Sequence, residues 1–327
     1  MKRRDIINII LFIMVFAFAA YRYSTRTYSS KKIAFVMDTL VEIKIETKSK
    51  NTEEILETAF QLIKEYENKF SMYKAESLIW KFNNSKIDSL KLDEDLMQII
   101  TLAKELNKKT ESHYDITIGA LSEIWDFDEQ KIPSEIEIEK AINNTGFQNL
   151  IFENDILHKP VEMKINLGSL AKGFIVDKVA EYLVQSDVIS GFVNAGGDMI
   201  IFGKKKPLNI GIQHPRGEVN EMIDVIKVGN RSVVTSGDYE RYFVKDGKRY
   251  HHIIDPITGY PSNNAVSVTV IAESTMLADA YSTALFLLES DEALDLAENT
   301  DGLEAVIYYL QDDKIEKLET SGMKDYH

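Results

Sequence analysis

The sequence of 327 residues contains no cysteine. The absence of thiols excludes disulfide bonds, thiolate zinc sites, iron–sulfur clusters, cysteine nucleophiles and a lipid-modified amino-terminal cysteine. The six prolines are scattered along the chain, and there is no internal repeat or low-complexity block. A composition of 44% hydrophobic and 28% charged residues is that of a globular protein. It excludes wholesale disorder, a collagen-like chain and a polytopic membrane protein.

Basic side chains are scarce relative to acidic ones. The chain has 38 lysines and arginines against 52 aspartates and glutamates, which gives a formal net charge of −14. The first 26 residues hold five basic side chains and one acidic side chain, so the remainder is more negative still. An acidic body repels DNA, RNA and anionic lipid, and we therefore expect no nucleic-acid partner.

The amino terminus has the layout of an export signal. A basic cluster at residues 2–4 precedes an apolar run at residues 6–20, and an aromatic and basic segment follows at residues 21–23. Because positive charge stays on the cytoplasmic side, we expect the rest of the chain on the extracytoplasmic face. A retained membrane anchor is the preferred interpretation, with cleavage after Ala19 as the alternative. A buried core helix would leave the basic cluster unexplained.

This layout predicts three segments. We expect residues 1–23 to form a signal or anchor segment and residues 24–32 to form a polar tether. Residues 33–327 would then form the functional body, and the composition marks no second domain boundary inside it.

Hydrophobic periodicity predicts a strand and three helices in the first half of the body. Residues 41–46 alternate with period two, which is typical of a half-buried strand. Apolar stripes predict one helix beginning at Asn51, a second over residues 93–108, and a third beginning at Ser134 and ending at Gly146.

The second half is richer in predicted strands. Asp246-Gly247 lies between two apolar strands and is the strongest hairpin signal in the chain. Further strands are predicted at residues 192–193, 208–212, 222–228, 266–271, 304–310 and 315–318. Helices at about residues 170–185 and 274–289 separate them. Strands joined by hairpins, with interspersed helices, predict an α+β fold with mixed or antiparallel sheets.

A small-residue segment at residues 168–173 (GSLAKG) leads into a predicted helix. Backbone amides can approach a phosphate at such a helix end. Phe174 stands where a nucleoside-triphosphatase loop needs lysine, and no G-x-G-x-x-G motif occurs in the chain. On its own, the segment is more typical of a plain helix start.

Two adjacent histidines, His251 and His252, lie on a predicted strand. Side chains alternate along a strand, so only one of the two can enter a cleft. Asp255-Pro256 and Gly259 form a turn beyond that strand and place a carboxylate near the same edge. A purely structural turn is the commoner explanation for this pattern.

Asp279 and Thr283 lie four residues apart on a predicted helix, and therefore on one face of it. A carboxylate and a hydroxyl in this arrangement can share a hard cation, and oxygen ligands favour magnesium over zinc. A hydrogen-bonded polar pair on a packed helix explains the spacing equally well.

Taken together and in order, these segments resemble the ApbE family of flavin transferases, which move FMN from FAD onto a protein. The resemblance covers about residues 33–320. It departs from the family pattern at Asp38, where glycine is usual, and at Asn166, where aspartate is usual. The matching segments are residues 37–39 (MDT), 70–83, 114–127, 172–173, 194–198, 236–239, 252–259 and 278–283.

The resemblance implies a T-fold-related body and a set of site residues. His252 would be the base that deprotonates the acceptor hydroxyl. The residues that would line the FAD site are Met37, Tyr73, His113, Tyr114, Asp115, Asn166, Lys172 and Ile254. The groups that would hold magnesium are the Ser169 main-chain carbonyl and the side chains of Asp279 and Thr283.

The resemblance also implies a reaction. Magnesium-dependent transfer of FMN from FAD to a threonine or serine hydroxyl would release AMP. The acceptor would be an exported or membrane-bound electron-transfer protein. Two alternatives remain open: an FAD pyrophosphatase that forms FMN and AMP in the same pocket, and an exported FAD-binding protein without catalysis.

Overall fold

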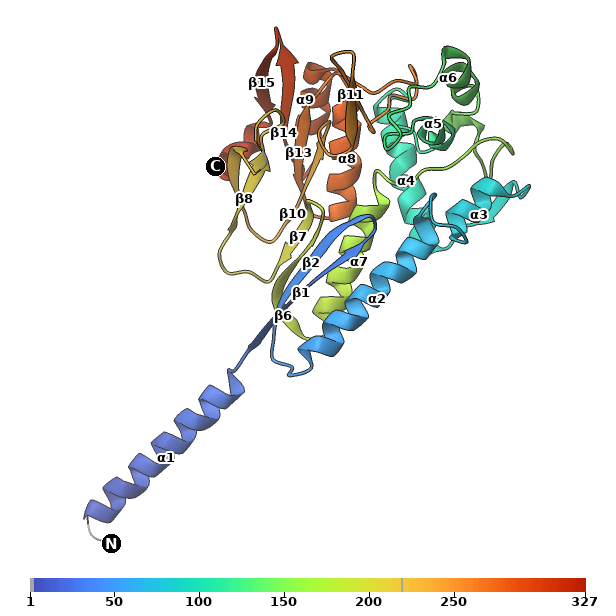
Figure 1. The fold of residues 1–327 in the computed structure, drawn as a ribbon. Coiled ribbons are helices and arrows are strands. Elements are labelled where there is room, and N and C mark those ends of the chain that lie inside the picture. Colours follow the sequence, from blue (N-terminus) through green and yellow to red (C-terminus); the bar gives the residue numbers. More distant parts are fainter. Residues whose placement is uncertain (1–2, 219) are drawn as a thin grey trace.

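An eight-stranded antiparallel sheet forms the centre of the body in the computed structural model, which describes residues 3–218 and 220–327 (Figure 1). The strand order is β1-β2-β6-β7-β10-β13-β14-β15, and each neighbouring pair is antiparallel. The strands are β1 (Tyr28–Val36), β2 (Thr39–Thr47), β6 (Val188–Ala195), β7 (Asp198–Phe202), β10 (Ser232–Gly237), β13 (Ser267–Ala272), β14 (Glu304–Gln311) and β15 (Lys314–Glu319).

Helices cover one face of this sheet. Helix α7 (Ala171–Gln185) packs on β6 and β7, α8 (Thr275–Leu287) on β10 and β13, and α2 (Thr52–Phe70) on β1 and β2. Every second residue of β2, at Val41, Ile43 and Ile45, is buried beneath them. Helices α4 (Glu94–Lys109) and α9 (Ser290–Glu298) pack against α8, and α9 also contacts β14. Residues 41–46 alternate between apolar and polar side chains because helices cover this end of the sheet on one face only.

Smaller elements complete the body. The β8 (Leu208–Gln213) and β9 (Met222–Val228) hairpin covers the opposite face of the sheet, where Ile212 and Ile226 join a second core cluster. A third cluster around Trp125 and Phe243 joins α5 (Gly119–Ile124) and α6 (Glu135–Ile142) to the β11 (Tyr242–Lys245) and β12 (Lys248–His251) hairpin. The remaining elements are α3 (Leu78–Asn84), β3 (Ser89–Lys91), β4 (Ile151–Glu153), β5 (Ile156–His158) and two short 3₁₀ helices.

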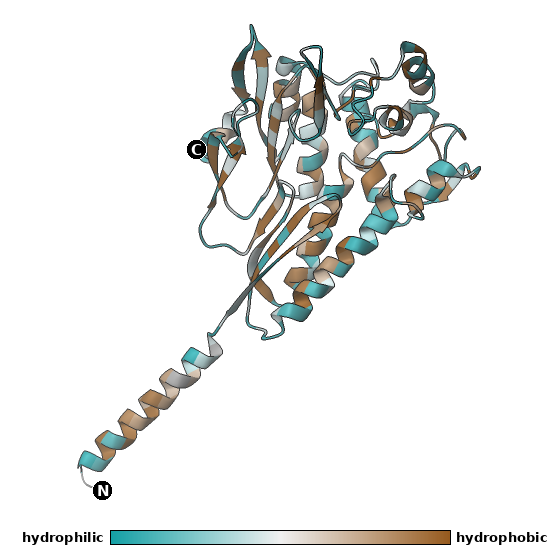
Figure 2. Cartoon of the chain, in the orientation of Figure 1, coloured by the Kyte–Doolittle hydropathy of each residue, from teal (hydrophilic) through white to brown (hydrophobic). Residues whose placement is uncertain are grey.

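The amino-terminal helix α1 (Arg3–Ser24) stands away from the body (Figure 1). It is long and apolar enough to cross a membrane, and Figure 2 shows its apolar middle between more polar ends. Strand β1 begins at Tyr28, within residues 24–32 where a tether was expected, and Thr25–Arg26–Thr27 connect it to α1. Residues 28–32 are polar because β1 is a sheet edge, where Lys31 pairs with Glu42.

The predicted helix boundaries hold with local differences. Asp93 caps α4 through the Leu96 amide at 3.0 Å, and Ser134 with Glu137 forms a capping box at the start of α6. Asn51 precedes α2 without a side-chain cap. Helix α6 ends at Ile142 rather than near Gly146, whose φ of +132° is incompatible with a continuing helix.

Gly173 allows α7 and α8 to cross in backbone contact. A Cβ atom at this position would lie 2.4 Å from the carbonyl oxygen of Thr275. We expect Gly173→Ala to lower the free energy of unfolding by about 1–3 kcal/mol, because the two helices must separate. Denaturant unfolding measures the change.

Gly229→Ala is the matched control, because a Cβ atom added at Gly229 would have no neighbouring atom within 4 Å. Equal unfolding midpoints for the two variants would contradict the close crossing.

Candidate functional site

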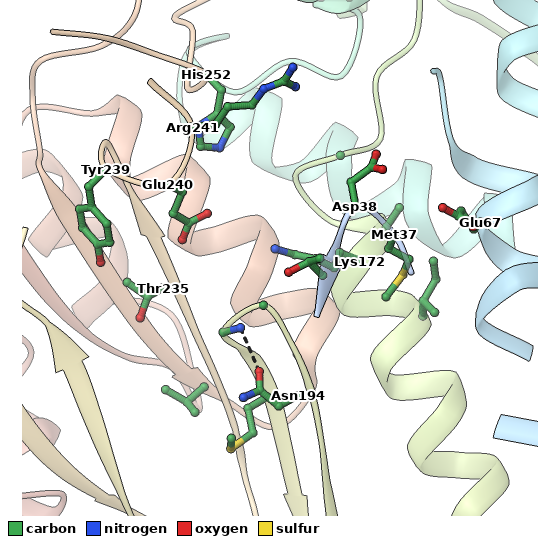
Figure 3. A pocket seen from close by; sticks show the side chains of 18 of the residues that line it. Met37, Asp38, Glu67, Lys172, Asn194, Thr235, Tyr239, Glu240, Arg241 and His252 are labelled. Carbon is green, nitrogen blue, oxygen red and sulfur yellow. Dashed lines mark hydrogen bonds between the residues drawn. The ribbon is translucent and has the colours of Figure 1, made fainter. Parts of the chain in front are cut away.

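Two adjoining cavities open where α7 begins, of about 920 and 520 Å³. Cavities of this size take small-molecule ligands. Their walls come from the β1–β2 turn, the β6–β7 turn, the start of α7 and the segment that follows β10 (Figure 3). The residues that line both cavities include Tyr73, Asn166, Gly168, Lys172, Thr235, Glu240, Arg241 and His252.

All of the site residues expected from the sequence line these cavities. Met37 faces the larger cavity, from a turn in which Met37 and Asp38 both have positive φ, of 53° and 55°. Such a two-residue turn between strands requires this strained backbone. The predicted site residues that line both cavities are Tyr73, Asn166, Lys172 and His252. Those that line the smaller one are His113, Tyr114, Asp115, Ser169, Ile254, Asp279 and Thr283.

Lys172 forms the centre of a buried charge cluster. Its Nζ lies 3.3 Å from Oδ2 of Asp198, and Asp279 Oδ2 accepts a hydrogen bond from the Gly173 amide at 2.9 Å. Burial acts to lower the pKa of Lys172, but the carboxylates of Asp198, Asp279 and Glu240 outweigh it and raise that pKa. Burial raises the pKa of Asp279, and the negative charge of Asp198 raises it further. Lys172 therefore remains an ammonium between two buried acids.

This cluster fits a bound cation. Asp198 Oδ2 is buried without a hydrogen-bond partner among the described residues, and a single ammonium faces two carboxylates. Thr283 Oγ1 lies 3.3 Å from Ser236 Oγ on the same wall. Within residues 3–218 and 220–327, no three acidic or histidine side chains form a metal cage. A cation here would complete its shell with a hydroxyl, a carbonyl, water and ligand phosphates, as magnesium does.

His252, not His251, enters the cleft. Strand β12 ends at His251, whose side chain is buried and whose Nε2 lies 2.7 Å from the Ser262 carbonyl oxygen. His252 follows the strand, and its imidazole is exposed to both cavities (Figure 3). Desolvation by the walls of the cleft, then His251 and Lys172, lower the pKa of His252 to about 4. The imidazole is therefore neutral at pH 7 and can accept a proton.

Hydrogen bonds within residues 255–259 close the turn that the sequence predicts, and Pro256 of this turn lines the smaller cavity. The Asp255 carboxylate accepts a hydrogen bond from the Ile257 amide at 3.0 Å, and the Gly259 amide donates to the Asp255 carbonyl at 2.8 Å. Oδ1 of Asp255 also lies 3.3 Å from Nδ1 of His113, so the turn orients the His113 side chain in the smaller cavity. This carboxylate supports the site without lining it.

Three predicted site residues also hold the cleft together. Asp115 accepts hydrogen bonds from Thr117 and from the Phe147 amide, which fixes the loop before α5. Tyr114 is buried, and its hydroxyl lies 2.8 Å from Ser169 Oγ. The third, Asn166, accepts a hydrogen bond from the Gly168 amide at 2.8 Å and donates to Ser122 Oγ at 3.0 Å. Its amide therefore bridges two segments, and a carboxylate could not donate the second bond.

Among the cleft residues that were not identified as site residues from the sequence are Asp198, Glu240 and Arg241. Asp198 ends the quoted segment 194–198, but only the packing of β7 on α7 places it beside Lys172. Glu240 and Arg241 directly follow the quoted segment 236–239, so extending that motif by two residues would have found them. Desolvation inside the cleft and then Asp198 raise the pKa of Glu240 to about 7, against the opposing effect of Lys172.

Comparisons with known proteins agree on one family. Residues 37–307 match the family model described as the ApbE family. The FAD:protein FMN transferase of Vibrio cholerae serotype O1 is 31% identical over 276 residues, which covers 81% of this chain and 82% of the relative. That of Haemophilus influenzae is 34% identical over 266 residues and covers 76% of both chains.

Solved structures share the fold. The crystal structure of the ApbE protein from Thermotoga maritima matches with a TM-score of 0.83 at 33% identity, covering 91% of this chain and 99% of that one. The flavin transferase ApbE from Vibrio cholerae matches with a TM-score of 0.80 at 27% identity, covering 92% and 100%.

The low pKa of His252 can be measured directly. We expect its imidazole NMR signals, assigned with a His252→Asn variant, to titrate near pH 4 rather than near the usual value of about 6.5. Lys172→Met should raise this pKa, because it removes a positive charge from the same cleft. Lys317→Met, outside both cavities, should leave it unchanged. A wild-type midpoint at the usual value would contradict the electrostatic description of the cleft.

Proposed function

This chain belongs to the ApbE family, and we propose that it is an FAD:protein FMN transferase. The observation that carries the proposal is the convergence of Lys172, Asp279 and His252 on one cavity. These residues come from α7, from α8 and from the end of β12, which are far apart in the sequence. An ammonium, a buried carboxylate and a neutral imidazole are the groups that transfer of a phosphoryl-linked nucleotide requires.

The proposed reaction moves FMN to a threonine or serine hydroxyl of the acceptor. The hydroxyl oxygen attacks the phosphorus on the FMN side of the FAD pyrophosphate, and the bridging P–O bond breaks. His252 accepts the hydroxyl proton, and AMP leaves with the bridging oxygen. FMN ends as a phosphodiester on the acceptor side chain. The position of His252 on both cavities supports this role, because its imidazole is unprotonated at neutral pH and faces the space where an acceptor hydroxyl would enter.

Magnesium fits this site, because the buried carboxylates outnumber the cation that faces them. We propose that Asp279, Thr283 and the Ser169 carbonyl hold the ion, which when bound would neutralise the bridging phosphates of FAD. Lys172 supplies a second, fixed positive charge beside it. The proposed FAD-lining residues are Met37, Tyr73, His113, Tyr114, Asp115, Asn166, Lys172 and Ile254.

The proposed acceptor is an exported or membrane-bound electron-transfer protein, reached from a membrane-anchored position. Helix α1 supports this location, because it is apolar enough to span a bilayer and only three residues connect it to the sheet. The basic residues at its amino-terminal end favour an orientation with the body outside the cytoplasm.

The transfer itself is tested with the full chain in detergent, FAD, magnesium and an exported flavoprotein domain as acceptor. We expect a yellow acceptor band that survives denaturation, and a mass increase equal to one FMN on threonine or serine. FMN and AMP appearing only in solution would identify a pyrophosphatase. FAD binding without AMP release would identify a carrier.

His252→Ala should lower the transfer rate by about a hundred- to ten-thousandfold, the usual value of a general base. FAD affinity should stay close to that of the wild type, because the imidazole is assigned to the acceptor hydroxyl. Asp279→Ala should lose AMP release in the presence of magnesium, because it removes a proposed ligand of the ion. Unchanged transfer in the histidine variant would remove His252 from the base role.

The membrane anchor is tested by fractionation. We expect the full chain in the membrane pellet after an alkaline carbonate wash, and a chain that begins at residue 25 in the soluble fraction. An intact chain that washes off would contradict the anchor. A mature protein that begins at residue 20 would show cleavage.

A further inference from the structure

Asp238 is a buried carboxylate bound by two arginines. Its side chain is 6% exposed, and its two oxygens accept hydrogen bonds from Arg216 at 2.7 and 2.6 Å. Arg249 approaches the same carboxylate at 3.9 Å and donates to the Asp238 carbonyl at 3.4 Å. A bidentate arginine pair of this kind fixes orientation as well as distance.

The three residues come from three separate segments. Arg216 lies in the connection between β8 and β9, Asp238 directly follows β10, and Arg249 lies on β12. Arg216 is itself held in place, since its amide donates to His214 Nδ1 at 3.1 Å. The guanidinium of Arg249 stacks 3.8 Å from the ring centroid of Tyr242. One carboxylate therefore joins two hairpins to the end of a central strand.

The residues next to Asp238 form a wall of the cleft. Tyr239 lines the larger cavity, and Glu240 and Arg241 line both, in a turn closed by the Glu240 amide and the Gly237 carbonyl at 3.5 Å (Figure 3). The His252 amide donates to the Arg241 carbonyl at 3.1 Å, so this turn also holds the histidine. Neither Arg216 nor Asp238 lines either of these two cavities.

We propose that Arg216 and Asp238 are positioning residues for the flavin nucleotide. The pair, which we call the Asp238 clamp, sets the place of the Tyr239–Glu240–Arg241 turn against α7. The proposal rests on the proposed function, because FAD is the ligand whose pose the clamp would set. Small displacements of a binding wall are costly, because a misplacement of about 1 Å can reduce a rate a hundredfold.

The test compares variants that change the charge in opposite directions. Arg216→Met removes a positive charge, whereas Asp238→Asn removes a negative one. We expect both to raise the Kd for FAD by about tenfold and to lower kcat as well, because the same turn holds His252 and a misplacement of about 1 Å can reduce a rate a hundredfold. Charge alone would make the asparagine variant bind the anionic nucleotide more tightly. Arg216→Lys should recover part of the affinity, because it restores the charge and one hydrogen bond.

Lys317→Met is the matched control. It breaks an ion pair with Asp224 of 2.9 Å on partly exposed β15, outside both cavities. It should leave the Kd for FAD unchanged, even if it lowers the melting temperature as much as Arg216→Met does.

Two results would overturn the clamp. One is a folded Arg216→Met protein, assayed well below its melting temperature, that binds FAD with the wild-type Kd. The other is tighter FAD binding by Asp238→Asn. If Arg216→Met fails to fold, the isosteric Asp238→Asn decides the question. A wild-type chain that binds no FAD would overturn the proposed function and the clamp together, whereas wild-type transfer with unaffected variants would overturn the clamp alone.

Discussion

The backbone contact between α7 and α8 is the constraint on which the site depends. Gly173 has no side chain, so the two helices approach until its amide can donate to Asp279 at 2.9 Å. The same contact places Lys172, one residue earlier, beside Asp198 at the end of the β6–β7 turn. A larger residue at position 173 would separate the carboxylate on one helix from the ammonium on the other. The absence of a side chain at Gly173 is therefore needed both for the packing of α7 on α8 and for the placement of the charged groups.

The electrostatics of the cleft follow from this packing. Charges buried together cost free energy unless they are compensated, and one ammonium does not compensate two carboxylates. Burial raises the pKa values of Asp279 and Asp198 and Lys172 opposes this effect, so a divalent cation would relieve the cost of holding both groups as carboxylates. The acidic body has no long-range attraction for a dinucleotide. Binding of the dinucleotide must therefore come from short-range contacts inside the cleft, where water is partly excluded.

The sequence predicts the site better than it predicts the connections around it. The resemblance to the ApbE family supplies every proposed site residue, and all of them line the two cavities. Asp198 could not be placed beside Lys172, since that pairing depends on β7 packing against α7. The start of β1 was also missed, because a polar edge strand has the composition of a tether. The Arg216–Asp238 pair joins residues 22 positions apart that no motif connects.

The cleft divides its groups between rigid elements and turns. Lys172 and Asp279 lie on packed helices, whose positions the core fixes. His252, Glu240 and Arg241 lie beyond the ends of strands, where few apolar contacts hold a backbone. A turn that must face a ligand with ångström accuracy needs a specific tie to the core. The buried Arg216–Asp238 pair provides that tie where the hydrophobic core does not reach. This explains why a buried carboxylate lies one residue before Tyr239, the first residue of the turn that lines the cavity.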